Sequence, residues 1–295
     1  MRFPFKPFVL LACLVAGASA APPNFKLPPL NHPATTVSLP GKFIWADLFT
    51  ADVAASTKFY GELFGWEWRT FGSGPSAYHL ASVAGEPVAG AVARPQVKGE
   101  TAGAHWIGYI SVPDIANAVQ QVSAAGGRVL LAPRPVPDRG QLAVVADNEG
   151  TLFGVLQSSS GDPADYRAEA GEWDWAQLLA GDVKQAAGFY STVFGYTLQE
   201  SPRPKLEDNV YLVSGGFARA GVAKLPVHPD WKPVWLGFIR VTDVAATVAK
   251  AKALGGNVLA DTITTPEGVQ VAVISDPAGA PVGLVSMNRP QPVVK

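Results

Sequence analysis

One stretch of the chain occurs twice, and this repeat constrains the fold more than any other feature of the sequence. Residues 42–65 and 172–195 align at a spacing of 130 residues. Because many of the identical positions hold aromatic residues, which are rare, similar composition does not explain the match. We therefore predict two similar domains in tandem. The identical positions are Trp45, Ala46, Leu48, Asp52, Val53, Phe59, Tyr60, Phe64 and Gly65, which recur as Trp175, Ala176, Leu178, Asp182, Val183, Phe189, Tyr190, Phe194 and Gly195.

Each of the two repeats contains two copies of a smaller module. A strand over residues 43–49 precedes Asp52, which has the residue type and position of a helix N-cap, and Gly65 suits the left-handed residue that ends a helix. Three short strands follow, up to residue 93. The same order begins again at His105, so the chain reads as four β-α-β-β-β modules. The predicted fold class is α+β, with two modules in each domain.

The module boundaries also divide the chain into segments. Residues 21–41 are rich in proline, which fixes φ and lacks a backbone donor, so they read as an extended linker. The sequence predicts a first domain over residues 42–158, an interdomain joint over 159–171, a second domain over 172–288 and a tail over 289–295.

The first 20 residues have the pattern of a signal peptide. Arg2 and Lys6 precede an apolar run over residues 8–17, and Ala18-Ser19-Ala20 forms a small-residue cleavage site. We expect a mature chain that begins at Ala21 and is periplasmic or secreted. The apolar run is too short to span a bilayer, so the chain is not predicted to be an integral membrane protein. An alternative is a lipoprotein, because Leu10-Leu11-Ala12-Cys13 resembles a lipidation site.

Charge and cysteine content exclude several kinds of function. Without Arg2 and Lys6 the chain keeps 21 of its 23 basic residues against 24 acidic ones, a net charge of −3. No basic patch is present, so nucleic acid is not an expected partner. Cys13 is the only cysteine, and a chain that begins at Ala21 therefore has no disulfide and no thiolate nucleophile.

The order of these motifs resembles a known superfamily. The Asp cap, Phe-Tyr and Phe-Gly pairs are followed by Val112-Pro-Asp114, by Gly126-Gly127 and by Asp147-Asn-Glu-Gly150, which has the counterpart Asp276-Pro-Ala-Gly279. The pattern is similar to that of the vicinal oxygen chelate superfamily of glyoxalases, bleomycin-resistance proteins and extradiol dioxygenases. The resemblance covers residues 42–158 and 172–287. It implies that each pair of modules curls eight strands into an open cup, and it suggests a lyase or a dioxygenase-like activity.

Members of that superfamily hold a divalent metal through His, Glu or Gln on the inner strands of the cup. Alignment on the Asp caps places tryptophan and aliphatic residues at the first two ligand positions in both domains, and alignment on Asp147 and Asp276 places glycine at the third. None of these side chains ligates Zn, Fe or Mn, so no metal cofactor is expected. A non-standard site formed by Asp47, His79 and His105 is an alternative. The six aligned positions are Trp45, Ile107, Gly154, Trp175, Leu236 and Gly283.

Strand alternation indicates which other side chains face the cups. Asp47 and His105 are the candidate catalytic residues, because a carboxylate and an imidazole serve acid-base chemistry. The counterpart of Asp47 is Gln177, so the fold itself does not require a carboxylate there. Packing or surface roles are the alternative for each candidate. The candidate ligand-binding residues are Trp45, His79, Tyr109, Trp175 and Gln177.

Three hypotheses for function follow. The first is an exported, metal-independent member of the superfamily that binds a small molecule in its aromatic first cup, for sequestration or for acid-base chemistry. The second is a metal-dependent lyase or dioxygenase with non-standard ligands, and the third is a non-catalytic structural or interaction module. Phosphate-binding glycine loops and a Gly-x-Ser-x-Gly elbow are absent from the sequence. Since each domain has two modules, a monomer completes both cups, and a homodimer is also compatible.

Overall fold

The computed structural model describes residues 25–94, 103–200, 209–227 and 231–287. The predicted signal peptide, Cys13, the cleavage site before Ala21 and the predicted tail lie outside the described residues. In the part that is described, no helix is both long enough and apolar enough to cross a membrane.

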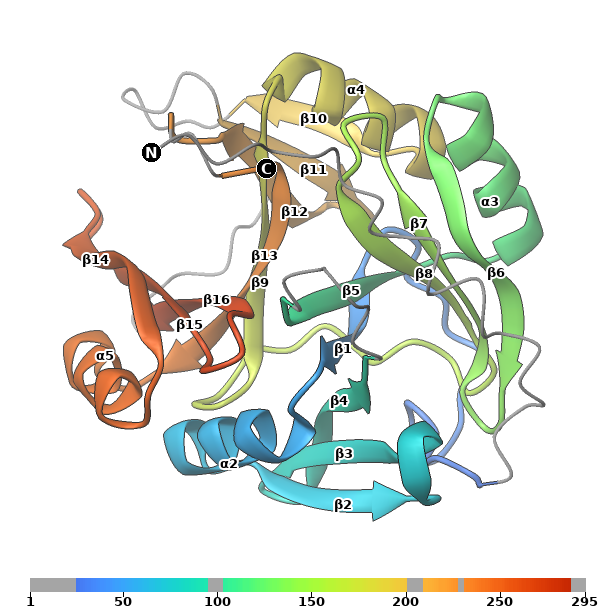
Figure 1. Cartoon of the computed structure of the whole chain (residues 1–295). Helices are drawn as coiled ribbons and strands as arrows, with labels where there is room; N and C mark the ends of the chain where they lie inside the picture. Colours follow the sequence, from blue (N-terminus) through green and yellow to red (C-terminus); the bar gives the residue numbers. More distant parts are fainter. Residues whose placement is uncertain (1–24, 95–102, 201–208, 228–230, 288–295) are drawn as a thin grey trace, which may run out of the picture.

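Two sheets of eight strands each form the molecule, one from each repeat (Figure 1). In the first sheet the order is β2-β3-β4-β1-β5-β8-β7-β6, and in the second it is β10-β11-β12-β9-β13-β16-β15-β14. The prediction of two tandem domains, each of two β-α-β-β-β modules, is confirmed. The strands are β1 (Phe43–Thr50), β2 (Glu67–Phe71), β3 (Tyr78–Val83), β4 (Glu86–Ala93), β5 (His105–Ser111), β6 (Arg128–Val136), β7 (Gly140–Ala146), β8 (Leu152–Ser158), β9 (Trp173–Ala180), β10 (Thr197–Glu200), β11 (Asn209–Ser214), β12 (Phe217–Lys224), β13 (Val234–Val241), β14 (Asn257–Thr264), β15 (Gln270–Ser275) and β16 (Pro281–Ser286).

Every module has one helix, and an aspartate starts each of them. The helices are α2 (Val53–Phe64), α3 (Ile115–Ala124), α4 (Val183–Phe194) and α5 (Val244–Ala253). The carboxylates of the four preceding aspartates accept hydrogen bonds from backbone N–H groups in the first turn, as predicted. Gly65 and Gly195 end α2 and α4 in the left-handed conformation, with φ of 76° and 70°.

The main hydrophobic core lies between the two domains. Helix α2 packs beside α5, and α3 packs beside α4, so that each module of one domain meets a module of the other (Figure 1). Trp106 donates to the Tyr60 hydroxyl at 2.9 Å, and Trp235 donates to the Tyr190 hydroxyl at 2.7 Å. The repeated aromatic residues of the helices therefore build the interface between domains rather than a ligand site.

The proline-rich segment before β1 is not a free linker. Leu27 is only 4% exposed, because residues 25–31 lie against the first sheet on the face away from the helices. We call these residues the cover segment. Residues 32–38, which follow it, are exposed. The prolines prevent strand pairing, but Leu27 and Leu30 still bury apolar surface, and that burial holds the segment on the sheet.

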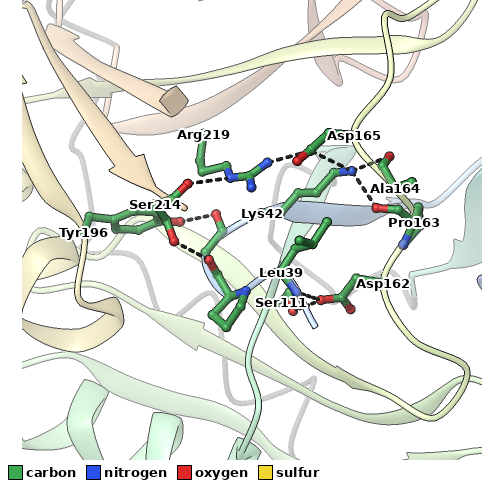
Figure 2. Close-up of polar contacts among 12 residues, drawn as sticks. Leu39, Lys42, Ser111, Asp162, Pro163, Ala164, Asp165, Tyr196, Ser214 and Arg219 are labelled. Carbon is green, nitrogen blue, oxygen red and sulfur yellow. Dashed lines mark hydrogen bonds and ion pairs between the residues drawn. The ribbon is translucent and has the colours of Figure 1, made fainter. Parts of the chain in front are cut away.

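A polar cluster anchors the chain immediately before β1. Figure 2 shows the Lys42 ammonium donating to the carbonyls of Pro163 and Ala164 and pairing with Asp165, which also pairs with Arg219. The backbone N–H of Leu39 donates to Asp162. The interdomain joint therefore fixes residues 39–42 to both domains.

Candidate functional site

The concave face of the first sheet, which we call the first cup, contains a buried carboxylate. Asp47 on β1 is 5% exposed, and its Oδ1 accepts a hydrogen bond from the Tyr78 hydroxyl at 2.6 Å and another from Trp45 Nε1 at 2.9 Å. Trp45 Nε1 also lies 3.0 Å from the Tyr78 hydroxyl oxygen. The pairing of β1 with β4 places Asp47 opposite Gly90, where the missing side chain leaves room for the carboxylate and for Tyr78.

Burial controls the protonation of this carboxylate. The pKa of Asp47 is raised, because loss of water outweighs the hydrogen bonds from Tyr78 and Trp45 and the positive charge of Arg139, which act in the opposite direction. Burial also raises the pKa of the Tyr78 hydroxyl, and the negative charge of Asp47 adds to the effect. A carboxyl group whose neutral form is favoured in this way can both accept a proton from a ligand and deliver one to it.

Tyr109 occupies the centre of the cup beside Asp47. Its strand β5 pairs with β8 so that Tyr109 stands opposite Gly154, and its ring lies over that glycine. A Cβ at Gly154 would come within 2.1 Å of the ring. Among the groups that lower the pKa of Asp47, the Tyr109 hydroxyl has the smallest effect. The position at which the superfamily resemblance implies a carboxylate ligand is thus covered by an aromatic ring.

Arg139 is part of the first cup although sequence reasoning did not select it. It lies in the turn between β6 and β7 and is 3% exposed. Its guanidinium carbon lies 3.9 Å from the centre of the Trp45 ring, a cation–π contact. Burial lowers the pKa of Arg139, and the nearby Tyr78 and Asp47 oppose that shift. Comparison of the two repeats could have identified it, because the equivalent turn of the second domain has Gly268 in place of an arginine.

The two candidate histidines do not join this group. His105 is on the cup side of β5 but at its start, opposite Phe49, and its pKa is lowered by burial and by the charge of Arg94 rather than affected by Asp47. His79 follows Tyr78 on β3 and therefore points to the opposite face, where its Nδ1 lies 3.1 Å from Thr70 Oγ1. Of the predicted residues, the structure brings Trp45, Asp47 and Tyr109 together.

The second cup repeats the frame of the first with different polar groups. Trp175 Nε1 donates to Gln177 Oε1 at 3.1 Å, as Trp45 does to Asp47. Phe238 lies over Gly283 as Tyr109 lies over Gly154. Trp175 also makes an edge contact with Tyr211, with ring centres 5.9 Å apart. Trp175 and Gln177 are therefore neighbours of each other but belong to a different cup from Asp47.

The side chains present do not fit the metal centre of the superfamily. Ile107 and Leu236 are buried hydrophobic residues, Trp45 and Trp175 use their indole N–H groups as donors, and Gly154 and Gly283 offer no side chain. Within residues 25–94, 103–200, 209–227 and 231–287, no three His, Cys, Asp or Glu side chains are placed to hold a metal ion. The alternative set of Asp47, His79 and His105 is not assembled either.

The cover segment closes part of the first cup. Leu27 packs in a cluster with Tyr78 and Leu80, and Leu30 packs in a second cluster with Tyr109, while Trp45 contacts both clusters. Between the two leucines, the backbone carbonyl of Pro28 accepts a hydrogen bond from Arg139 Nε at 2.6 Å. The backbone of this segment therefore contributes one polar group to the site.

Comparison with known protein families gives two adjacent matches. The model of the glyoxalase/bleomycin resistance protein/dioxygenase superfamily matches residues 42–155, and that of the glyoxalase-like domain matches residues 175–285. Each match lies within one of the two sheets and covers both of its modules.

Two curated relatives extend over most of the chain. The putative glyoxylase CFP32 of Mycobacterium tuberculosis (strain CDC 1551 / Oshkosh) is 32% identical over 250 residues, which are 84% of this chain and 94% of that protein. The anthracycline biosynthesis protein DauV of Streptomyces sp. (strain C5) is 33% identical over 267 residues, or 86% of this chain and 96% of that protein.

Solved structures share the fold at low sequence identity. The Mn(II)-bound glyoxalase from Novosphingobium aromaticivorans superposes with a TM-score of 0.61 at 15% identity, covering 88% of this chain and 85% of that one. The 2,2',3-trihydroxybiphenyl 1,2-dioxygenase from Sphingomonas wittichii strain RW1 gives a TM-score of 0.59 at 16% identity, covering 86% and 92%. These likenesses concern the fold alone.

Proposed function

Because the chain belongs to the glyoxalase/bleomycin resistance protein/dioxygenase superfamily, we propose that it is an exported, metal-independent member that binds a small molecule in its first cup. The single observation that carries this proposal is the buried Asp47 carboxylate, which is hydrogen-bonded to Tyr78 and Trp45 at a position where the second domain has Gln177. The second domain folds without a carboxylate at this position, so the fold does not require Asp47. This favours a role for Asp47 in ligand recognition.

The chemistry proposed for Asp47 is proton transfer or hydrogen bonding to the ligand. Its raised pKa suits a group that exchanges a proton with a ligand, and Tyr78 and Tyr109 supply hydroxyl groups at its side. The aromatic wall formed by Trp45 and Tyr109 favours a ligand with an aromatic or amphipathic body. Two relatives are named for anthracycline biosynthesis, which supports including an anthracycline among the compounds tested.

Binding by the purified mature chain tests this proposal. We expect an aromatic ligand found by thermal shift to lose at least about tenfold in affinity in Asp47→Asn, since the hydrogen-bonding character of the site changes. Gln177→Asn is the matched control in the second cup and should leave the affinity unchanged. Equal affinity in wild type and Asp47→Asn for every ligand found would contradict the proposal.

Metal analysis separates the proposal from the metal-dependent alternative. After growth with added Zn, Fe, Mn and Ni, we expect no stoichiometric metal in the protein, because the aligned positions lack donor side chains. Stoichiometric metal that is lost in Asp47→Ala or His105→Ala would favour a lyase or dioxygenase with non-standard ligands.

A second candidate function rests on the cover segment. Leu27 and Leu30 fill part of the first cup, which favours a structural or interaction module whose cavity is closed by its own chain. Failure of every compound to stabilise the wild-type protein, together with failure to stabilise Leu27→Ala, would support this alternative.

Mass spectrometry of the exported protein tests the proposed processing, with Ala21 as the expected first residue and a lipidated Cys13 as the contrary outcome.

A further inference from the structure

A buried guanidinium in the first cup has a donor that no described residue satisfies. Arg139 is 3% exposed, and its Nε donates to the Pro28 carbonyl at 2.6 Å, whereas its Nη2 is buried without a hydrogen-bond partner among the described residues. An unsatisfied buried donor is unfavourable, and more so if it is charged. The polar requirement of Arg139 is thus met in part only.

The geometry of the two donors indicates what would complete the site. Nε and Nη2 lie on one edge of the planar guanidinium, and this edge holds both oxygens of a carboxylate in bidentate pairs. The Pro28 carbonyl offers a single oxygen to this edge. Trp45 stacks on the guanidinium and fixes its plane, so the edge cannot rotate freely to find another partner.

The cover segment has the contacts of an occupant rather than of a strand. Leu27 and Leu30 bury their side chains on the two halves of the cup, and the carbonyl between them meets Arg139. The segment makes no strand pairing with the first sheet, and Pro28 and Pro29 have no N–H to donate. Its remaining backbone bonds run from the N–H groups of Leu30 and Asn31 to Ser160 Oγ.

The residues that follow the cover segment anchor the chain, so the segment can leave the cup while the rest of the chain stays in place. Residues 32–38 are exposed, but the chain is anchored from residue 35 onward, because the Thr35 N–H donates to the Ser160 carbonyl and the Asp162 N–H donates to the Val37 carbonyl, each at 2.8 Å. Asp162, Asp165 and Tyr196 then fix residues 39–42 to the joint and the second domain (Figure 2). The cover segment precedes this anchor and is held by the side chains of Leu27 and Leu30 and by a few hydrogen bonds, so it can open locally while the anchor stays in place.

We propose that the cover segment is a displaceable occupant of the first cup and that Arg139 recognises a small carboxylate, with an apolar body, that takes its place. The carboxylate would accept hydrogen bonds from Nε and Nη2, and the apolar body would replace Leu27 and Leu30 beside Trp45. This inference rests on the proposed function, because it names the class of ligand for the same cup.

Paired acids and amides test the recognition by Arg139. Phenylacetate, hexanoate and indole-3-acetate are each compared with the corresponding neutral amide by calorimetry on the full mature chain. We expect the acid to bind at least about tenfold more tightly than its amide, and Arg139→Gln to remove this preference. If acids and amides bind equally in an Asp47-dependent manner, this inference fails while the proposed function stands. If no acid or amide binds, this inference fails, while the proposed function stands as long as another ligand binds in an Asp47-dependent manner.

Variants of the cover segment test displacement independently of Arg139, which keeps the inference falsifiable if Arg139→Gln does not fold. Leu27→Ala weakens the occupant, so it should strengthen binding of the acids several-fold, because less contact is lost when the segment leaves. Val37→Ala, an exposed change in the same stretch of chain, should have no effect. Hydrogen exchange at the amides of Leu27, Leu30 and Asn31 should accelerate when an acid binds. Unchanged or slower exchange, or unchanged affinity in Leu27→Ala, would overturn the displacement.

Discussion

The two cups have the same frame and different contents. In both, a tryptophan on the first strand donates to the residue two positions later, and an aromatic ring of the neighbouring strand lies over a glycine. Four polar positions of the first cup change together in the second. The strand register and the turn hydrogen bonds equate Asp47 with Gln177, Tyr78 with Asn209, Tyr109 with Phe238 and Arg139 with Gly268.

This difference separates what the fold needs from what the first cup adds. The second domain forms the same eight-stranded sheet without a carboxylate or a tyrosine pair at these positions. It also has a buried charge pair, Arg240 with Asp174, but the partners are in direct contact and satisfy each other. In the first cup, by contrast, Asp47 and Arg139 are not in contact as an ion pair, and Arg139 Nη2 is without a partner among the described residues. Asn209 Oδ1 in the second cup is also buried without such a partner, so the cups differ in the charge of the unpartnered group. A polar group that the fold does not need and does not satisfy is suited to a ligand.

The largest expected effect on stability concerns the glycine under the aromatic ring, which both cups share. Gly154→Ala and Gly283→Ala should each lower the free energy of unfolding by about 3 kcal/mol, because the new Cβ would lie 2.1 Å from the Tyr109 ring and 2.3 Å from the Phe238 ring. Chemical denaturation measures both. Gly188→Ala is the control, since a Cβ there meets no atom within 4 Å in the middle of α4 and should stabilise by up to about 1 kcal/mol. A loss below about 1 kcal/mol at either sheet glycine would show that the frames are not alike.

The charge of Asp47 predicts a difference between the cups that depends on pH. Because the folded-state pKa of Asp47 is raised, its contribution to stability is complete below the ordinary aspartate range and is lost as pH rises through the folded pKa. Asp47→Asn removes that loss. The free energy of unfolding of Asp47→Asn relative to wild type should therefore rise with pH. The slope is up to about 1.4 kcal/mol per pH unit between the unfolded-state and the folded-state pKa of Asp47.

Gln177→Glu is the mirror experiment. It adds a carboxyl group to the second cup, so its stability relative to wild type should fall as pH rises, if the second cup desolvates a charge as the first does. Denaturation of the three proteins between about pH 4 and about pH 8 gives both differences. A flat difference for Asp47→Asn would mean that water or a counter-charge reaches Asp47 and that the polar contrast between the cups is smaller than described.

The sequence predicted the frame well, because its determinants are local or repeated. Asp52 and Asp114 cap their helices as expected, and Gly65 ends α2 in the left-handed conformation. Each of these signals lies within a few residues of the structure it specifies. The repeat at a spacing of 130 residues then extended the prediction from one domain to the other.

The contents of the first cup were harder to predict, because they depend on residues far apart in the sequence. Arg139 reaches Trp45 from a turn without periodicity, and only comparison with Gly268 marks it. His79 was predicted as a ligand-binding residue, but its neighbour Tyr78 is the one that faces Asp47. Neighbouring residues of a strand point to opposite faces, so an error of one residue reverses the prediction. Leu27 and Leu30 were missed because the proline-rich composition reads as a linker, whereas their burial depends on the cup that they cover.

The smallest expected effect concerns the hydroxyl that distinguishes Tyr109 from Phe238. Tyr109→Phe should cost up to about 1 kcal/mol. It should also move the pKa of Asp47 further upward, because the Tyr109 hydroxyl favours the charged carboxylate. The midpoint of the pH-dependent stability difference between wild type and Asp47→Asn should therefore shift upward when Tyr109→Phe is added to both proteins. Phe238→Tyr should give no such pH dependence, because Gln177 does not titrate. An unchanged midpoint in the first cup would mean that the Tyr109 hydroxyl serves packing alone, and the functional contrast between the cups would then depend on Asp47, Tyr78 and Arg139.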